Sequence, residues 1–197
     1  MNVIGLTGGV GSGKSVVAEM LKDMYKVELL TADEIGHKVM EQGTDGFREV
    51  VSCFGNGITA DDGSIDRGRL AEILFGNTEA LEKMNSIIHP KVKAYISEYI
   101  SDRRDKRGII ILESAILYET GCDKLCDEVW YVFVPREVRI KRLAEGRGYS
   151  AVKAESIMDR QKPDEFFIER ADRVIDNGGS KDELRKSLRS KIHQSRD

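Results

Sequence analysis

The amino-acid sequence predicts a doubly wound α/β domain, in which helices cover both faces of a parallel sheet, with a helical insert. Continuous apolar runs at 109–112 and 129–134 are separated by helical stretches, and strands buried on both faces have this composition. A glycine-rich segment at 8–15 lies between a short apolar run and an amphipathic pattern. That order of strand, glycine-rich loop and helix is typical of phosphate-binding α/β domains.

The first half of the chain begins with alternating strand and helix patterns. Residues 3–7 predict a short buried strand, and Lys14–Met24 has its apolar residues on one face of a helix. Residues 27–30 predict a second strand, after which Asp33 is a suitable N-cap for the next helix. From 43 to about 107 the pattern is mostly helical and polar, which predicts the insert.

The second half continues the alternation. Residues 109–112 and 129–134 predict strands, and Pro135 ends the second of them. Residues 136–148 predict a basic helix, and residues 174–175 predict a last short strand. A final helix has an apolar stripe formed by Leu184, Leu188 and Ile192. The three prolines are each expected at an element boundary.

Composition and charge exclude several classes of protein. Of the 197 residues, 40% are hydrophobic and 33% are charged, which suits one domain with a well-solvated surface. The formal net charge of -3 disfavours nucleic-acid binding, and no apolar run approaches the roughly 20 residues that span a bilayer. The cysteines lack paired spacing, which disfavours a disulfide framework: Cys53, Cys122 and Cys126. We expect a cytoplasmic protein with no nucleic-acid, membrane or obligate protein partner.

Residues 8–15, G-G-V-G-S-G-K-S, match the Walker A pattern G-x-x-x-x-G-K-[ST]. Glycines let backbone N–H groups turn toward phosphates, and the helix that begins near Lys14 adds the positive end of its dipole. Lys14 can reach the β- and γ-phosphates, and the Ser15 hydroxyl can bind Mg²⁺. The sequence therefore predicts ATP–Mg²⁺ binding by a P-loop NTPase-type fold.

A Walker A loop alone does not distinguish kinases, GTPases and motor ATPases. The chain has no N-K-x-D tetrad for guanine recognition and no H-R-D or D-F-G motif of protein kinases. It is short for an ATPase with a separate output domain. A small-molecule kinase is favoured, while a kinase for a nucleoside or nucleotide and a nucleotide-gated regulatory protein stay open as alternatives.

Two acidic residues follow predicted strands, at the sheet edge where ligands bind in open α/β folds. Asp33 can accept a proton from an attacking hydroxyl or orient it, or it can only cap the next helix. Glu113 occupies the place of a Walker B-like acid that holds Mg²⁺ through water, or it is an exposed strand-end acid.

Several further polar residues are candidates for ligand contacts. His89 and Arg67 are either substrate contacts in the insert or ordinary packing and helix-start residues. Asn177 lies in a predicted turn and can contact adenine. A basic cluster follows the strand at 129–134, in which Arg139 and Arg142 share a helix face. It is either an ordinary solvated helix or, as the Walker A loop favours, a set of lid cations that neutralise the transferred phosphoryl group. Its members are Arg136, Arg139, Lys141, Arg142 and Arg147.

An ordered set of short segments extends over most of the chain, from Ile4 to about Leu184. It comprises G-L-T-G-G-V-G-S-G-K-S at 5–15, Asp33, F-G at 54–55, D-G-S-I-D-R at 62–67, H-P at 89–90, A-I-L-Y-E at 115–119, Arg142 with Arg147, Gln161, and A-D-R-V-I-D-N-G at 171–178. Each segment is weak alone, but their common order and gaps are specific. Together they resemble the dephospho-CoA kinase family.

The resemblance implies ATP-dependent phosphorylation of the ribose 3′-hydroxyl of dephospho-CoA, the last step of coenzyme A biosynthesis. It implies a nucleotide core at 1–42, 108–135 and 171–197, a helical substrate insert at 43–107 and a lid at 136–170. Carried onto this chain, Asp33 is the general base or orienter, Arg142 and Arg147 act from the lid, and Arg67 and His89 lie toward the acceptor. The ATP phosphates are assigned to Gly11, Ser12, Gly13, Lys14, Ser15 and Val16.

Three positions depart from the family pattern. Thr31 gives T-A-D where D-A-D is common, and Ala115 replaces a proline. Val16 replaces a threonine, which removes one hydroxyl donor to an α-phosphate oxygen. Because Lys14, Ser15 and Asp33 are kept, we expect these changes to affect affinity and rate more than the type of reaction.

Overall fold

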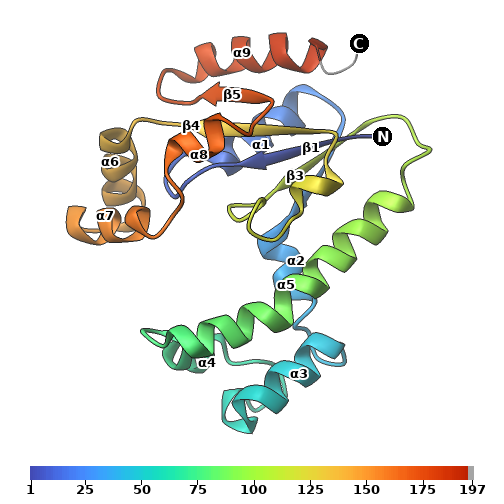
Figure 1. The fold of residues 1–197 in the computed structure, drawn as a ribbon, viewed down its shortest axis with the longest axis vertical. Coiled ribbons are helices and arrows are strands. Elements are labelled where there is room, and N and C mark those ends of the chain that lie inside the picture. Colours follow the sequence, from blue (N-terminus) through green and yellow to red (C-terminus); the bar gives the residue numbers. More distant parts are fainter. Residues whose placement is uncertain (195–197) are drawn as a thin grey trace. The chain divides into compact units, whose positions relative to one another are not determined.

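The computed structural model describes residues 1–194 (Figure 1). The chain forms two compact units. The core unit joins Met1–Leu29 to the chain from Arg104 onward, and the helical unit is Leu30–Arg103. These units divide the chain at other residues than the functional parts expected from the sequence, so that functional division stays a prediction.

A five-stranded sheet has the order β2-β3-β1-β4-β5. Its central strand β1 pairs in parallel with β3 and β4, and β4 pairs in parallel with β5. The pattern of apolar runs therefore predicted the parallel α/β fold correctly. The strands are β1 (Asn2–Thr7), β2 (Val27–Thr31), β3 (Ile109–Glu113), β4 (Glu128–Phe133) and β5 (Arg173–Asp176).

Both faces of the sheet are covered within the core unit. On one face, α1 (Lys14–Met24) and α9 (Lys181–Gln194) bury their apolar stripes against the strands. The fully buried Leu21, Trp130 and Leu188 belong to this cluster. On the other face, the ring of Tyr131 stacks on Phe167, with ring centroids 5.0 Å apart.

The 136–170 segment lies at the carboxyl end of the sheet (Figure 1) and consists of three helices. They are α6 (Arg136–Arg147), α7 (Ala151–Asp159) and α8 (Asp164–Ile168). A small cluster of Leu143, Ala154 and Met158 joins α6 to α7, and Val10 of the glycine-rich loop packs against it. This segment is therefore in contact with the loop.

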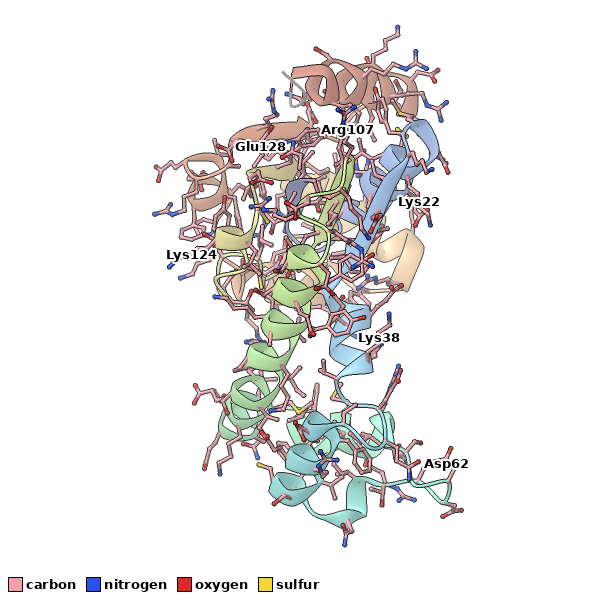
Figure 2. All side chains as sticks on the ribbon, turned by 90° about the vertical axis from the view of Figure 1, so that its right-hand side faces the viewer. Lys22, Lys38, Asp62, Arg107, Lys124 and Glu128 are labelled. Carbon is pink, nitrogen blue, oxygen red and sulfur yellow. The ribbon has the colours of Figure 1, made fainter. Side chains whose placement is uncertain are left out.

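The helical unit contains four α-helices among its described residues, with a short 3₁₀ turn at Asn56–Ile58. Three of these helices begin at a capping side chain, since Thr44, Asp66 and Asn77 each accept a hydrogen bond from a backbone N–H in the first turn. The turn before α4 is shaped by Asp62, which accepts hydrogen bonds from Ser64 (Figure 2). The helices are α2 (Ala32–Lys38), α3 (Asp45–Phe54), α4 (Arg67–Leu74) and α5 (Thr78–Ser101).

The expected N-cap role of Asp33 is wrong. The helix α2 begins at Ala32, directly after β2, so the capping position belongs to Thr31, whose side chain makes no capping hydrogen bond. No loop separates strand from helix, which places Asp33 inside the first turn. Its carboxylate still lies near the positive end of the helix dipole.

The expected element boundary at Pro90 is also wrong, because Pro90 lies inside α5. Pro135 and Pro163 do precede α6 and α8. Proline removes one hydrogen bond to the carbonyl four residues earlier and disfavours a continuous helix. In α5 the cost is offset by packing on both sides of the proline, since Met84, Ile88, Val92 and Ile96 are all buried.

All three cysteines are free thiols. Cys122 is buried, and burial raises the pKa of the Cys126 thiol to about 12, so Cys126 stays protonated. Among the described side chains, no group of three or more His, Cys, Asp and Glu residues has a metal-binding arrangement. None of the helices in the described part of the chain has the length and apolar composition needed to cross a membrane.

Gly5 is the position in β1 where a side chain is expected to cost the most stability. A Cβ atom there would lie 2.7 Å from Leu117 Cδ2 and 2.8 Å from Cys126 Sγ. We expect Gly5→Ala to lower the free energy of unfolding by about 1–3 kcal/mol, as overpacking does. Urea unfolding measures this change.

Gly146→Ala is the matched control, because Gly146 lies within α6 and no atom lies within 4 Å of its added Cβ. It is expected to raise the free energy of unfolding by about 0.5–1 kcal/mol through helix propensity. A Gly5→Ala protein as stable as the wild type would contradict the tight packing of β1.

Candidate active site

The glycine-rich loop connects β1, the central strand, to α1. Gly11 and Gly13 have φ angles of 77° and 80°, in the left-handed region that favours glycine. Gly13 is also the N-cap residue of α1, so the loop ends where the helix dipole is positive. The loop thus has the backbone geometry and position of a phosphate site.

Lys14, the first residue of α1, turns its side chain back over the loop. Its Nζ donates a hydrogen bond to Gly8 O at 2.8 Å. Within the loop, Ser12 N donates to Gly9 O at 3.2 Å. The contact with Gly8 keeps a cationic group at the loop, next to the N-terminus of α1, where the helix dipole also favours an anion.

Buried side-chain hydroxyls are normally hydrogen-bonded. Among the described residues, three buried side-chain oxygens have no partner, on Thr7, Ser12 and Tyr118. Two of these, Thr7 and Ser12, lie at the start of the loop and within it. Their unsatisfied oxygens fit a site built to receive a polar ligand.

Glu113 ends β3 beside the loop and accepts a hydrogen bond from Ser15, with Ser15 Oγ 2.9 Å from Glu113 Oε1. Glu113 is only 8% exposed, so the alternative of an exposed strand-end acid is wrong. A hydroxyl beside a carboxylate is the kind of hard oxygen pair that Mg²⁺ prefers. The residues present therefore fit the predicted metal.

Asn177 follows β5 and is buried against the loop, where its Nδ2 donates to Ser12 O at 2.8 Å. The backbone carbonyl of Asn177 accepts a hydrogen bond from Arg142 Nη2 at 2.8 Å. The side-chain amide of Asn177 is thus bound to the loop. A contact between Asn177 and adenine stays a prediction. Arg147 is exposed at the end of α6.

Val10, at the tip of the loop, is held by side chains whose role in the loop the sequence patterns did not predict. Gln161 accepts a hydrogen bond from Val10 N at 2.9 Å, and Arg139 Nε donates to Val10 O at 2.9 Å. Arg139 and Arg142 both lie in α6, but Arg139 donates a hydrogen bond to Val10 and Arg142 donates one to Asn177. Only the family resemblance indicated that Gln161 belongs to a functional segment.

The remaining candidates belong to the helical unit, whereas the loop belongs to the core unit. They are Asp33, Arg67 and His89. Asp33 and Arg67 are exposed in the first turns of α2 and α4. His89 is half-buried in α5, and burial lowers its pKa, so its imidazole is neutral at pH 7.

A pocket of about 440 Å³ lies within the helical unit. Its lining combines six apolar residues with five polar or charged ones, and neither Asp33 nor His89 belongs to it. The polar and charged lining residues are His37, Glu41, Gln42, Ser64 and Arg67. A pocket of this size and composition can hold a small organic ligand that carries an anionic group. The apolar lining residues are Met40, Ile65, Leu70, Ala71, Leu74 and Met84.

Comparison with known proteins gives one consistent result. A model of the dephospho-CoA kinase family matches residues 2–183. A dephospho-CoA kinase from Moorella thermoacetica is 36% identical over 192 residues, which cover 96% of this chain and 90% of that protein.

Solved structures agree with the sequence comparison. The fold is similar to the crystal structure of TT1252 from Thermus thermophilus, with a TM-score of 0.78, 27% identity and coverage of 98% of this chain and 97% of that one. It is also similar to a dephospho-CoA kinase from Campylobacter jejuni, with a TM-score of 0.70, 25% identity and the same coverage. The chain therefore belongs to the dephospho-CoA kinase family.

Proposed function

We propose that this chain transfers the γ-phosphoryl group of ATP to the ribose 3′-hydroxyl of dephospho-CoA, giving coenzyme A and ADP. The observation that carries the proposal is the phosphate loop, with Glu113 hydrogen-bonded to Ser15, in a chain that belongs to this kinase family. The reaction is the last step of coenzyme A biosynthesis.

The ATP phosphates are assigned to the loop from Gly11 to Val16. Lys14 binds the β- and γ-phosphates, and Arg142 and Arg147 neutralise charge on the transferred group. Ser15 would hold Mg²⁺ directly and Glu113 would hold it through water, and the ion would supply positive charge that neutralises the phosphates. The hydrogen bond between Ser15 and Glu113 supports this pairing of ligands.

Asp33 is assigned the acceptor hydroxyl. Its carboxylate takes the 3′-hydroxyl proton as the new bond from O3′ to the γ-phosphorus forms, and the bond from that phosphorus to the bridging oxygen of ADP breaks. The assignment is supported by position, because Asp33 follows the last residue of β2 by two and ligands bind at the carboxyl ends of parallel strands.

The pocket lined by Arg67 is assigned to dephospho-CoA. This acceptor combines a diphosphate with a long, partly apolar arm, and the pocket combines the Arg67 guanidinium and other polar groups with six apolar side chains. Arginine binds phosphate oxygens in a bidentate manner, which suits Arg67 for the diphosphate. His89 is assigned a neighbouring contact with the acceptor.

Arg67→Ala is expected to raise the KM for dephospho-CoA by about 10–100-fold, the effect of losing one charge-assisted hydrogen bond. The KM for ATP should stay near that of the wild type. Arg48→Ala is the control, since Arg48 is an exposed arginine of the same unit whose partners, Asp45 and the backbone carbonyl of Gly43, lie at the surface. Equal KM values for the acceptor in both variants would remove Arg67 from the site.

The function itself is tested by ADP release in the presence and absence of dephospho-CoA. We expect release to depend on dephospho-CoA and on Mg²⁺. Activity with a nucleoside monophosphate but not with dephospho-CoA would favour a kinase of another acceptor. Slow hydrolysis that no hydroxyl compound stimulates would favour a regulatory nucleotide-binding protein.

A cytoplasmic location is part of the proposal. Its support is the set of three free thiols, since reduced cysteines are typical of intracellular compartments. Because the proposed acceptor is a small molecule, the proposed reaction requires no nucleic-acid or membrane partner.

A further inference from the structure

The tip of the phosphate loop is held through both backbone polar groups of one residue, Val10. Gln161 Oε1 accepts a hydrogen bond from Val10 N at 2.9 Å, and Arg139 Nε donates to Val10 O at 2.9 Å. Both side chains come from the 136–170 segment, which is about 130–150 residues away along the chain. A contact so specific to one backbone unit needs an explanation beyond general packing.

Arg139 is fixed in this position by the rest of its guanidinium. The side chain is buried, with 6% of its residue exposed. Its Nη1 donates to Asp164 Oδ1 at 3.2 Å and its Nη2 to Gln161 Oε1 at 3.3 Å. Each of the three guanidinium nitrogens thus has a partner, so Arg139 cannot rotate away from Val10 without leaving a buried charge unpaired.

Asp164 is itself held in place by β4. Tyr131 donates its hydroxyl hydrogen to Asp164 Oδ1 at 2.5 Å, and the Tyr131 ring stacks on Phe167. Burial and the bond to Asp164 raise the pKa of Tyr131, so the phenol remains a donor at any physiological pH. We call these four side chains, Arg139, Gln161, Asp164 and Tyr131, the Arg139 network.

The loop is shaped to fit the network. A Cβ atom at Gly9 would overlap the Arg139 guanidinium, so only glycine leaves room for it. The Val10 side chain packs on Leu143, Ala154 and Met158, which belong to the same segment. The Val10 backbone and side chain therefore both contact the 136–170 segment, and the missing side chain at Gly9 leaves room for Arg139.

We propose that Arg139 and Gln161 are positioning residues of the nucleotide site, which hold the loop tip in the conformation that binds ATP phosphates. Four of the eight loop residues are glycines, and glycine-rich backbone loses the most conformational entropy when it is ordered. When the tip is already fixed, ATP binding does not have to order it, so the entropic cost of binding is lower. The proposal rests on the proposed function only in taking ATP as the ligand.

A purely structural role is the competing explanation. In that case the network only stabilises the fold of α6–α8, and its loss lowers the melting temperature without changing ATP affinity. The two roles differ in a binding measurement that needs no acceptor, so the test stands even if dephospho-CoA is not the substrate.

The test compares Gln161→Leu with Gln161→Glu in the full chain. Leucine removes the acceptor for Val10 N, whereas glutamate keeps an acceptor oxygen for Val10 N and Arg139. We expect Gln161→Leu to weaken ATP–Mg²⁺ binding, measured by titration calorimetry, about tenfold. Gln161→Glu should bind ATP–Mg²⁺ with an affinity within about twofold of the wild type, because the acceptor oxygen is kept.

Steady-state kinetics and a second variant complete the design. For Gln161→Leu the KM for ATP should rise while kcat at saturating ATP and the KM for dephospho-CoA stay near wild type. Arg139→Lys, which keeps the charge but cannot hold three partners, should show the same pattern. Glu145→Gln, an exposed change on α6, is the control for both.

Wild-type ATP affinity in folded Gln161→Leu and Arg139→Lys proteins would overturn the proposal, whatever their melting temperatures. Equal weakening by Gln161→Leu and Gln161→Glu would also overturn it, because the acceptor oxygen would then be irrelevant. If the wild-type chain binds no ATP, both this inference and the proposed function fail. If it binds ATP but does not phosphorylate dephospho-CoA, only the proposed acceptor is lost.

Discussion

Asp33→Asn is expected to lower kcat for dephospho-CoA phosphorylation by about 10²–10⁴-fold, the usual contribution of a general base. Asparagine keeps the shape of the side chain but cannot take the hydroxyl proton. Because Asp33 has no assigned contact with ATP, calorimetric ATP affinity should be unchanged. Single-turnover measurements at saturating substrates separate the chemical step from product release.

Glu34→Gln is the matched control for this variant. Glu34 is the exposed neighbour of Asp33 in the first turn of α2, so both changes remove one negative charge near the same helix dipole. Any loss of helix stability is therefore shared, and only the loss of turnover should be specific to Asp33. Equal turnover in the two variants, with both folded, would remove Asp33 from the chemistry.

Lys14→Met is expected to lower kcat/KM for ATP by at least about 10²-fold, since one preorganised charged donor at the transferred group is lost. The lysine follows Gly13 at the start of α1 and turns back over the loop to Gly8. Methionine fills a similar volume, so folding should be preserved. The kinetics are followed by ADP release, and the melting temperature of the variant is checked in parallel.

Lys22→Met provides the comparison for Lys14→Met on the same helix. Lys22 extends into solvent from the last turn of α1 (Figure 2), and its ion pair with Glu19, 3.8 Å from Lys22 Nζ to Glu19 Oε2, lies at the surface. Its loss should leave ATP kinetics unchanged. A Lys14→Met protein with wild-type kcat/KM would argue against phosphate binding by the loop.

Local sequence patterns predicted the features that depend on local chemistry. The Walker A spacing identified the loop, and the run at 109–112 identified β3 because a strand buried on both faces has no polar alternation. The same kind of reasoning placed Glu113 at the ligand-binding edge of the sheet, since the carboxyl ends of neighbouring parallel strands meet at one edge. The register of Leu6 with Glu113 agrees with this placement.

The features that the sequence did not reveal depend on contacts between distant parts of the chain. Pro90 was expected to end a helix, but packing on both of its sides keeps α5 continuous. Asp33 was expected to cap α2, but β2 passes into that helix without a loop. The partners of Val10 lie 129 and 151 residues away, a separation that no local pattern encodes.

Asn177, which closes the loop from the last strand, has a consequence for the protein while it is being synthesised. The loop leaves the ribosome first, yet its strand β1 pairs with β3 and β4, and Ser12 is held by Asn177. At about 5–20 residues per second, roughly ten to thirty seconds pass between the synthesis of the loop and that of Asn177. The nascent chain therefore completes its nucleotide site only after Asn177 has been synthesised and has left the ribosome.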